Sequence, residues 1–258
     1  MTAAVTYRFY TSNYDRVSEA VSKEPQVARE TDYYLKNIEK VKSIDDFMAD
    51  SRLVNYAMKA YGLEDMSYAK AFIRKVLEGG VDDKESFANK LSDPRYRELA
   101  ADFNFVRYGD TTTTFERTRS GVVDRYKRQT IEEQAGETNT GARLALYFQR
   151  KAGEINSAYD ILGDQALLQV VRTALGLPQQ MSLLDIDKQA QLITDSLDLT
   201  DLQDPNFVDD FLNDFVVRWD VQNPETPPVP TIAPLVSSGI QGISTDLLTS
   251  IQSLKSGR

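Results

Sequence analysis

The chain has 258 residues, of which 41% are hydrophobic and 27% are charged, and it contains neither cysteine nor histidine. This composition is typical of a soluble globular protein, and it excludes disulfides, thiolate metal sites, cysteine nucleophiles and catalytic triads that depend on histidine. The net charge of −9 disfavours nucleic acid and anionic membranes as partners, and nothing in the composition points to a cofactor.

The first 28 residues are expected to form an N-terminal arm. Their beginning, "MTAAVTYRFYTSNYDR", lacks the basic and apolar regions of a secretory signal peptide. No stretch of the chain approaches the roughly 18 consecutive apolar residues that a membrane helix requires. We therefore expect a cytoplasmic protein, or one that a flagellar-type apparatus exports without a cleaved signal peptide.

One phrase occurs twice, with a constant offset of 114 residues. "DDFMADSRLVNYAMKAYGL" (45–63) aligns with "YDILGDQALLQVVRTALGL" (159–177), with aspartate, leucine, alanine and glycine at matching positions. Such self-similarity indicates that a structural unit of about 80 residues is duplicated. The two units are expected to cover residues 29–108 and 143–220.

Each unit divides into helices. The first helices are expected over residues 29–42 and 143–156, where apolar side chains recur at three- and four-residue spacing. The next helix of each unit is expected to begin after a serine N-cap and to end at a glycine in the left-handed conformation, as in a Schellman motif. These capping residues are Ser43 and Gly62 in the first unit, and Ser157 and Gly176 in the second.

A third helix is expected near residues 67–78 and 184–196, and a fourth begins at an Asp-Pro step in each unit. The aspartates Asp93 and Asp204 are the expected N-caps, and the proline that follows tolerates the first helical position because its missing N–H has no partner there.

Between the units, residues 109–142 are expected to form a polar loop followed by a helix whose Val123, Tyr126 and Ile131 face inward. Because no alternating strand pattern competes, the sequence predicts an all-α fold.

Acidic residues are concentrated in the second unit. Residues 141–220 carry 13 Asp and Glu against 6 Lys and Arg, whereas residues 27–108 carry 15 against 14. The most acidic stretch, "LDLTDLQDPNFVDDFLNDF", lacks the aspartate spacing and the closing glutamate of a calcium loop. Helix caps, solvated faces and ion pairs with a basic partner explain these carboxylates better than a metal site does.

The last segment, residues 221–258, has a different composition. "NPETPPVPTIAP" holds five of the nine prolines, which is typical of an extended linker. The residues beyond it have the apolar spacing of an amphipathic helix, which either packs on its own domain or docks on another chain. We expect this tethered helix to be the partner-binding element, through Ile240, Ile243, Leu247, Ile251 and Leu254.

Two long stretches resemble a known family. "YKRQTIEEQAGETNTGARLALYFQRKAGEINSAYDILGDQALLQVVRTALGLP" and "ARETDYYLKNIEKVKSIDDFMADSRLVNYAMKAYGLED" are similar to an uncharacterised alphaproteobacterial family, classed as a domain of unknown function, whose genes tend to lie among flagellar genes. The resemblance covers roughly residues 5–220. It implies a motility context, and it supplies no catalytic residues to carry over.

Three functions remain open at this point. We favour a non-catalytic, flagellum-associated protein that acts by binding a protein partner, as a structural component or an assembly factor. One alternative is an acidic cytosolic chaperone or regulator that holds flagellar subunits before export. The other is a carboxylate-based enzyme, which two acids converging from different helices in a deep cleft would favour. The sequence does not indicate the oligomeric state.

Overall fold

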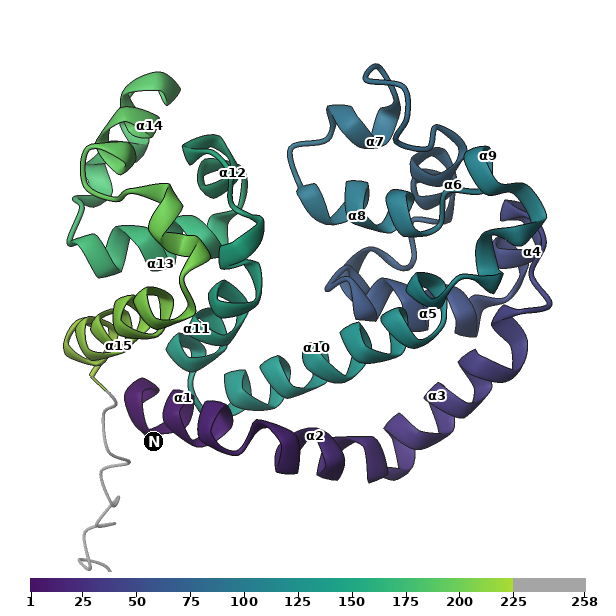
Figure 1. Ribbon diagram of the computed structural model, residues 1–258, viewed down its shortest axis with the longest axis horizontal. Helices are drawn as coiled ribbons and strands as arrows, with labels where there is room; N and C mark the ends of the chain where they lie inside the picture. The colour runs from purple at the N-terminus through teal and green to yellow at the C-terminus, as the bar shows by residue number, and fades with distance from the viewer. Residues whose placement is uncertain (225–258) are drawn as a thin grey trace, which may run out of the picture. The chain divides into compact units, whose positions relative to one another are not determined.

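The computed structural model describes residues 1–224, and every regular element in this range is a helix (Figure 1). The all-α fold expected from the sequence is therefore confirmed. In chain order the α-helices are α1 (Ala3–Ser12), α2 (Tyr14–Lys23), α3 (Pro25–Ile38), α4 (Ile44–Ala49), α5 (Ser51–Ala60), α6 (Lys70–Glu78), α7 (Phe87–Lys90), α8 (Pro94–Asp102), α9 (Phe105–Tyr108), α10 (Ser120–Thr138), α11 (Thr140–Lys151), α12 (Ala158–Gly163), α13 (Gln165–Leu175), α14 (Ile186–Thr194) and α15 (Pro205–Gln222). Short 3₁₀ helices lie between them at η1 (Glu64–Met66), η2 (Gly109–Thr114), η3 (Glu116–Thr118), η4 (Ala152–Glu154), η5 (Gln179–Leu183) and η6 (Leu199–Gln203).

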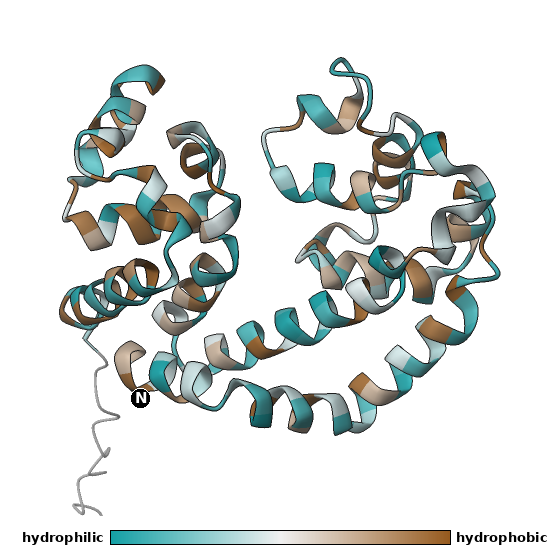
Figure 2. Cartoon of the chain, viewed as in Figure 1, coloured by the Kyte–Doolittle hydropathy of each residue, from teal (hydrophilic) through white to brown (hydrophobic). Residues whose placement is uncertain are grey.

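Two hydrophobic clusters define two lobes within residues 1–224. The first lobe is built around buried residues between Val21 and Ile131, and the second around buried residues between Ala135 and Trp219. Helix α10 contributes to both clusters and, with α1–α3, runs beneath the two lobes in Figure 1. Apolar residues dominate α13 in the second lobe, whereas α10 is mainly hydrophilic (Figure 2). The two lobes thus lie side by side and share α10.

The expected N-terminal arm is helical, and its first helix, α1, belongs to the second lobe, whereas Val21 of α2 is buried in the first. Ala3 and Tyr7 are buried in the second hydrophobic cluster, where α1 packs against α11 and α15. The backbone N–H groups of Ala3 and Ala4 donate hydrogen bonds to the Asp220 carboxylate at 2.7 and 3.1 Å. Since a carboxylate at a helix N-terminus satisfies unpaired N–H groups and complements the helix dipole, Asp220 anchors the start of the chain to α15.

The structure divides one expected helix of each unit into two. The segment from Ser43 to Gly62 contains α4 and α5, and the equivalent segment of the second unit contains α12 and α13. Asp50 and Asp164 start the second helix of each pair, because each carboxylate accepts hydrogen bonds from two backbone N–H groups of the following turn. The expectation of one continuous helix was therefore wrong.

Two helix boundaries also differ from the expected ones. Helix α3 begins at Pro25, four residues before the expected start, because proline fits the first turn of a helix. Helix α11 begins at Thr140, where the side chain of Asn139 accepts hydrogen bonds from two backbone N–H groups. Both helices also end before the expected residues 42 and 156.

The segment before α10, expected as a polar loop, is largely helical and partly buried. It contains η2 and η3, and the side chains of Thr112, Thr113 and Thr118 are fully buried. Their hydroxyls donate to backbone carbonyls, as in the 2.7 Å hydrogen bond from Thr113 to Val41. The threonine run is thus satisfied by backbone acceptors, which is the usual condition for burying a hydroxyl.

Residues 225–258 lie outside the described residues, and with them the five apolar residues of the predicted partner-binding helix. Helix α15 extends two residues into the segment that was expected to begin the linker at residue 221. Of the helices in residues 1–224, none has both the length and the apolar character that crossing a membrane requires.

Candidate functional site: the cleft between the lobes

The two lobes enclose a cleft made of two adjoining hollows, here called the interlobe cleft. One hollow, of about 510 Å³, lies between residues 81–101 of the first lobe and residues 151–167 of the second. The other, of about 520 Å³, lies between Tyr61 and the start of α8 on one side, and α11 and the start of α13 on the other. Clefts of this size between structural units are common binding sites.

A narrow neck separates the hollows. Ser92, Gly163 and Asp164 line both of them. A side chain at Gly163 would place its Cβ only 3.3 Å from the backbone oxygen of Ser92, so the two lobes approach closely at this point. Glycine permits this approach because it carries no Cβ.

Helix periodicity directs the polar side chains of α8 into the cleft. Tyr96, Leu99 and Ala100 are buried in the core of the first lobe. The residues between them, Arg97 and Glu98, therefore lie on another face of the helix and line the cleft. From the second lobe, the end of α11 and the turn η4 supply residues to the opposite wall.

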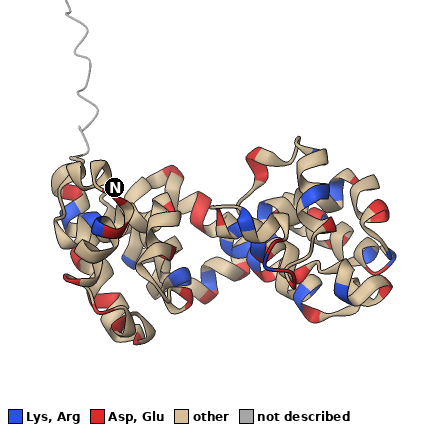
Figure 3. Ribbon diagram, turned by 90° about the horizontal axis from the view of Figure 1, so that it is seen from above, with Lys and Arg blue, Asp and Glu red and all other residues tan. Residues whose placement is uncertain are grey.

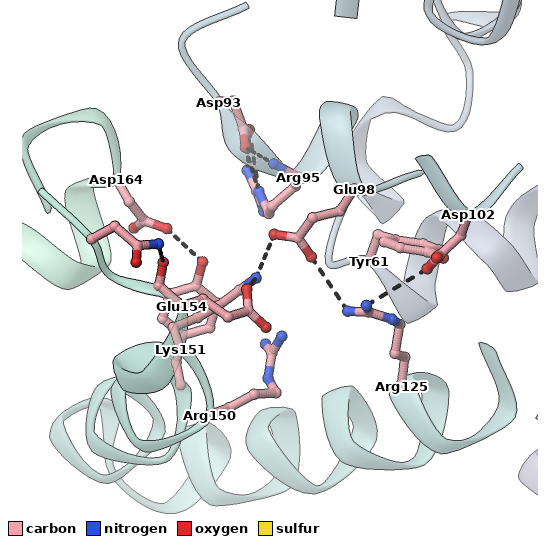
Figure 4. A network of polar contacts seen from close by, with 12 residues as sticks. Tyr61, Asp93, Arg95, Glu98, Asp102, Arg125, Arg150, Lys151, Glu154 and Asp164 are labelled. Carbon is pink, nitrogen blue, oxygen red and sulfur yellow. Dashed lines mark hydrogen bonds and ion pairs between the residues drawn. The ribbon is translucent and has the colours of Figure 1, made fainter. Parts of the chain in front are cut away.

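An ion-pair network crosses from one lobe to the other (Figure 4). The amine of Lys151, a residue that is only 5% exposed, pairs with the Glu98 carboxylate of α8 and, at 2.7 Å, with that of Glu154. The second oxygen of Glu98 accepts a 3.3 Å hydrogen bond from Arg125 of α10. Arg125 also pairs with Asp102 at 3.6 Å. Because a buried ammonium is costly unless it is paired, the two glutamates allow Lys151 to lie between the lobes.

Two tyrosines donate hydrogen bonds at the second hollow. Tyr147 donates to Asp164 at 2.5 Å, and Tyr61 donates to Asp102 at 2.6 Å. Burial, followed by the charge of the neighbouring aspartate, raises the pKa of Tyr147 above its ordinary value of 10.0, and the same two causes raise the pKa of Tyr61. Both side chains are therefore neutral donors at neutral pH.

The chemistry available in the cleft is mainly that of binding. Glu98 and Glu154 converge on one point from different elements, which is part of the condition set above for a carboxylate enzyme. The Lys151 amine lies between them and pairs with both. In residues 1–224, no group of three acidic side chains has an arrangement that could hold a metal ion.

The carboxylates in the acidic stretch of the second unit cap helices or face solvent. Asp198 and Asp204 accept hydrogen bonds from backbone N–H groups at the starts of η6 and α15. Asp201, Asp210 and Asp214 are exposed. Caps and solvated faces, as the sequence suggested, account for these residues.

The capping residues chosen from the sequence lie at helix ends, and two of them, Gly62 and Asp93, line the second hollow of the cleft. The serines accept a hydrogen bond from a backbone N–H at the third helical position, as does Ser43 from Asp46 at 3.1 Å. The two glycines have positive φ angles of 68° and 67°. The aspartates begin α8 and α15. The full set is Ser43, Gly62, Asp93, Ser157, Gly176 and Asp204.

The cleft residues themselves were not singled out from the sequence. Glu98 and Lys151 are 53 residues apart in the chain, and neither belongs to a recognisable motif. The duplicated pattern could have indicated one pair of cleft residues, Tyr147 and Asp164. They align with Tyr33 and Asp50 of the first unit, which also form a hydrogen bond.

Comparisons with known proteins give a family. Residues 60–208 match the model of a family described as "Protein of unknown function (DUF1217)". Among solved structures, the X-ray crystal structure of protein AGR_C_984 from Agrobacterium tumefaciens is 53% identical, covers 87% of this chain and 97% of its own, and superposes with a TM-score of 0.80. Among curated proteins, none matches the chain. The resemblance to an alphaproteobacterial family of unknown function is thereby confirmed.

Proposed function

The chain belongs to the DUF1217 family of proteins of unknown function, and from this premise we propose that it is a non-catalytic, motility-associated protein that works by binding a protein partner. The observation that carries the proposal is the interlobe cleft, which draws its walls from both lobes and is open to solvent. Its motility context comes from the resemblance to a family whose genes tend to lie among flagellar genes.

The cleft suits a binding role because its central charges are already neutralised. Lys151, Glu98 and Arg125 compensate one another, so the floor of the cleft is polar without a strong uncompensated charge. Fixed, hydrogen-bonded side chains of this kind hold a surface in one shape, which reduces the entropy lost when a partner binds.

Deleting the gene in its native host tests the proposal. We expect reduced swimming in soft agar and the loss of a defined flagellar substructure in electron micrographs, with both restored by the wild-type gene. Normal swimming together with normal flagella would refute the motility role.

The location of the protein separates the two binding roles. A structural component should be found in purified flagella or in the culture medium, whereas a chaperone or regulator should remain in the cells. Immunoblots of the cell, medium and flagellar fractions decide between them. The predicted partner-binding helix beyond residue 224 remains a prediction from the sequence.

A carboxylate-based enzyme is the second candidate, and one observation favours it. Glu98 and Glu154 converge on Lys151 inside a cleft of about 510 Å³. Replacing both glutamates by glutamine and scoring the rescue of the deletion strain tests this candidate, with the protein level followed by immunoblot. An enzyme would lose all function while the protein stays folded, whereas a binding protein would keep a part of it.

A further inference from the structure

The carboxylates that line the interlobe cleft are all engaged by groups of the protein itself. Three of them accept hydrogen bonds from backbone N–H groups at helix starts, and two form ion pairs with Lys151. The cap carboxylates are Asp93, Asp160 and Asp164, and the paired ones are Glu98 and Glu154. A carboxylate at a helix N-terminus offsets the positive end of the helix dipole, so these acids contribute little uncompensated negative charge to the cleft.

Two guanidinium groups in the cleft have no such partner within residues 1–224. Lys151 and Arg95 pair with carboxylates, but the guanidinium groups of Arg97 and Arg143 have no hydrogen bond or ion pair with any residue in 1–224. Arg97 lines the first hollow from α8, and Arg143 lines the second from α11. Both side chains are exposed.

The two hollows together are lined by four basic and five acidic side chains. In Figure 3, Lys and Arg gather near the middle of the molecule, where the two lobes meet, although the net charge of the chain is −9. Because the five carboxylates already have partners within the protein, Arg97 and Arg143 are the charged side chains of the cleft that remain to receive an anionic group.

The rest of the lining suits a peptide. Apolar side chains, among them Leu91, Ile155 and Tyr159, line the first hollow, and Tyr159 is 52% exposed. Amide side chains, including Asn156 in the first hollow and Gln165 in the second, can donate to and accept from a peptide backbone. A chain segment that crosses the neck at Ser92 and Gly163 would reach both hollows.

We propose that the interlobe cleft binds a partner segment containing both acidic and apolar residues, whose carboxylates are received by Arg97 and Arg143. The inference rests on the proposed function, since it names the chemistry of the protein partner. The two arginines lie on opposite lobes and on opposite sides of the neck, so they would fix the position of the segment along the cleft. Its apolar side chains would fill the hollows.

The test measures the binding of short synthetic peptides to the full-length protein by fluorescence anisotropy. One labelled peptide contains Glu, Leu and Ser, and a matched one carries Lys in place of Glu. We expect the acidic peptide to bind more tightly than the basic one, with an affinity that falls as salt is added.

Substitution of the two arginines locates the binding site. The R97Q/R143Q variant should bind the acidic peptide at least about tenfold more weakly, because a charge-assisted hydrogen bond is lost at each position. The matched control is R8Q/R16Q, which makes the same change of net charge at exposed arginines of α1 and α2 that line neither hollow. It should bind within about twofold of the wild type. Circular dichroism melting curves verify that the variants are folded.

Charge reversal gives a second readout. The R97E/R143E variant should lose the acidic peptide and bind the basic one better than the wild type does. Equal binding by wild type and R97Q/R143Q, an equal loss in the control, or a preference of the wild type for the basic peptide would each overturn the inference. These outcomes do not depend on motility, so normal swimming of the deletion strain would refute the proposed motility role without changing the peptide result.

Discussion

At the scale of single residues, the same hydrogen bond occurs in both units but in different surroundings. Tyr33 donates to Asp50 at 2.8 Å, and Tyr147, which lies 114 positions later, donates to Asp164 at 2.5 Å. For Tyr33 the hydrogen bond itself is the main cause of a raised pKa, whereas for Tyr147 the main cause is burial. Burial thus affects Tyr147 more than Tyr33, although both hydrogen bonds are only partly buried.

This difference predicts unequal costs for removing the two hydroxyls. We expect Tyr147→Phe to lower the free energy of unfolding by about 1–3 kcal/mol, because the Asp164 carboxylate loses a donor away from water. Tyr33→Phe should cost about 1 kcal/mol or less, since water can replace the hydroxyl there. Urea unfolding of the two variants makes the comparison, and equal costs would contradict it.

A second residue-scale prediction concerns the end of α13. Gly176 has a φ of 67°, a left-handed conformation that strains a β-branched residue. Gly176→Val should therefore destabilise the protein by roughly 1 kcal/mol or more. Gly176→Asn is the matched control, because asparagine tolerates this conformation better. Thermal melting checks both, and an unchanged melting temperature for the valine variant would count against the assignment.

Alkaline pH should also unfold the protein through its buried tyrosines. Burial is the main cause of the raised pKa values of Tyr34, Tyr61 and Tyr147. Because their folded-state pKa lies above the ordinary 10.0, the stability they contribute is fully present below pH 10 and is lost as the pH rises further. We expect the last tyrosinate absorbance to appear together with the loss of helical circular dichroism. Gradual ionisation of all 13 tyrosines in a helical protein would contradict this.

At the scale of helices, local signals in the two units give matching geometry. Gly62 and Leu63 donate to the carbonyls of Lys59 and Met58 at 2.9 and 2.8 Å, which is the hydrogen-bond pattern of a Schellman motif. The same pattern occurs 114 residues later, where Leu177 donates to Arg172 at 2.9 Å. Both ends were foreseen because a Schellman stop depends on a few adjacent residues.

The duplication itself remains a prediction at this scale. The helix order α3, α4, α5, α6, α8 in the first unit corresponds to α11, α12, α13, α14, α15 in the second. We expect these two sets to superpose on their Cα atoms in that order, both in this chain and in the related Agrobacterium structure. A superposition that matches only isolated helices would show that the sequence echo has no structural counterpart.

The features that could not be predicted from the sequence are the starts of two helices and a contact between distant helices. Asp50 and Asp164 were matched between the units but not identified as N-caps, because each lies inside a pattern that is apolar at helical spacing on both sides. The pairing of Glu98 with Lys151 could not be predicted, since it depends on how two lobes meet and not on neighbouring residues. Local caps are encoded nearby, whereas the cleft is a product of tertiary packing.

At the scale of the whole molecule, residues 1–224 contain two hydrophobic clusters and an anchored N-terminus. Among the residues that the structure describes, the buried members of the two clusters extend to Trp219, and α15 ends at Gln222. The start of the chain is held by α15 through Asp220, which also precedes the proline-rich segment.

Truncation after Pro224 tests whether the last 34 residues serve a partner or the body. If the apolar stripe from Ile240 to Leu254 docks on another chain, the truncated protein should keep the melting temperature of the full chain, because it retains both hydrophobic clusters of residues 1–224. It should nevertheless fail to restore swimming to the deletion strain. Four or five leucine and isoleucine side chains, worth roughly 1.5–3 kcal/mol each when buried, suffice for micromolar binding once ordering costs are subtracted. A truncated protein that melts many degrees lower would show that the segment stabilises its own body, and one that restores swimming would show that the segment is dispensable.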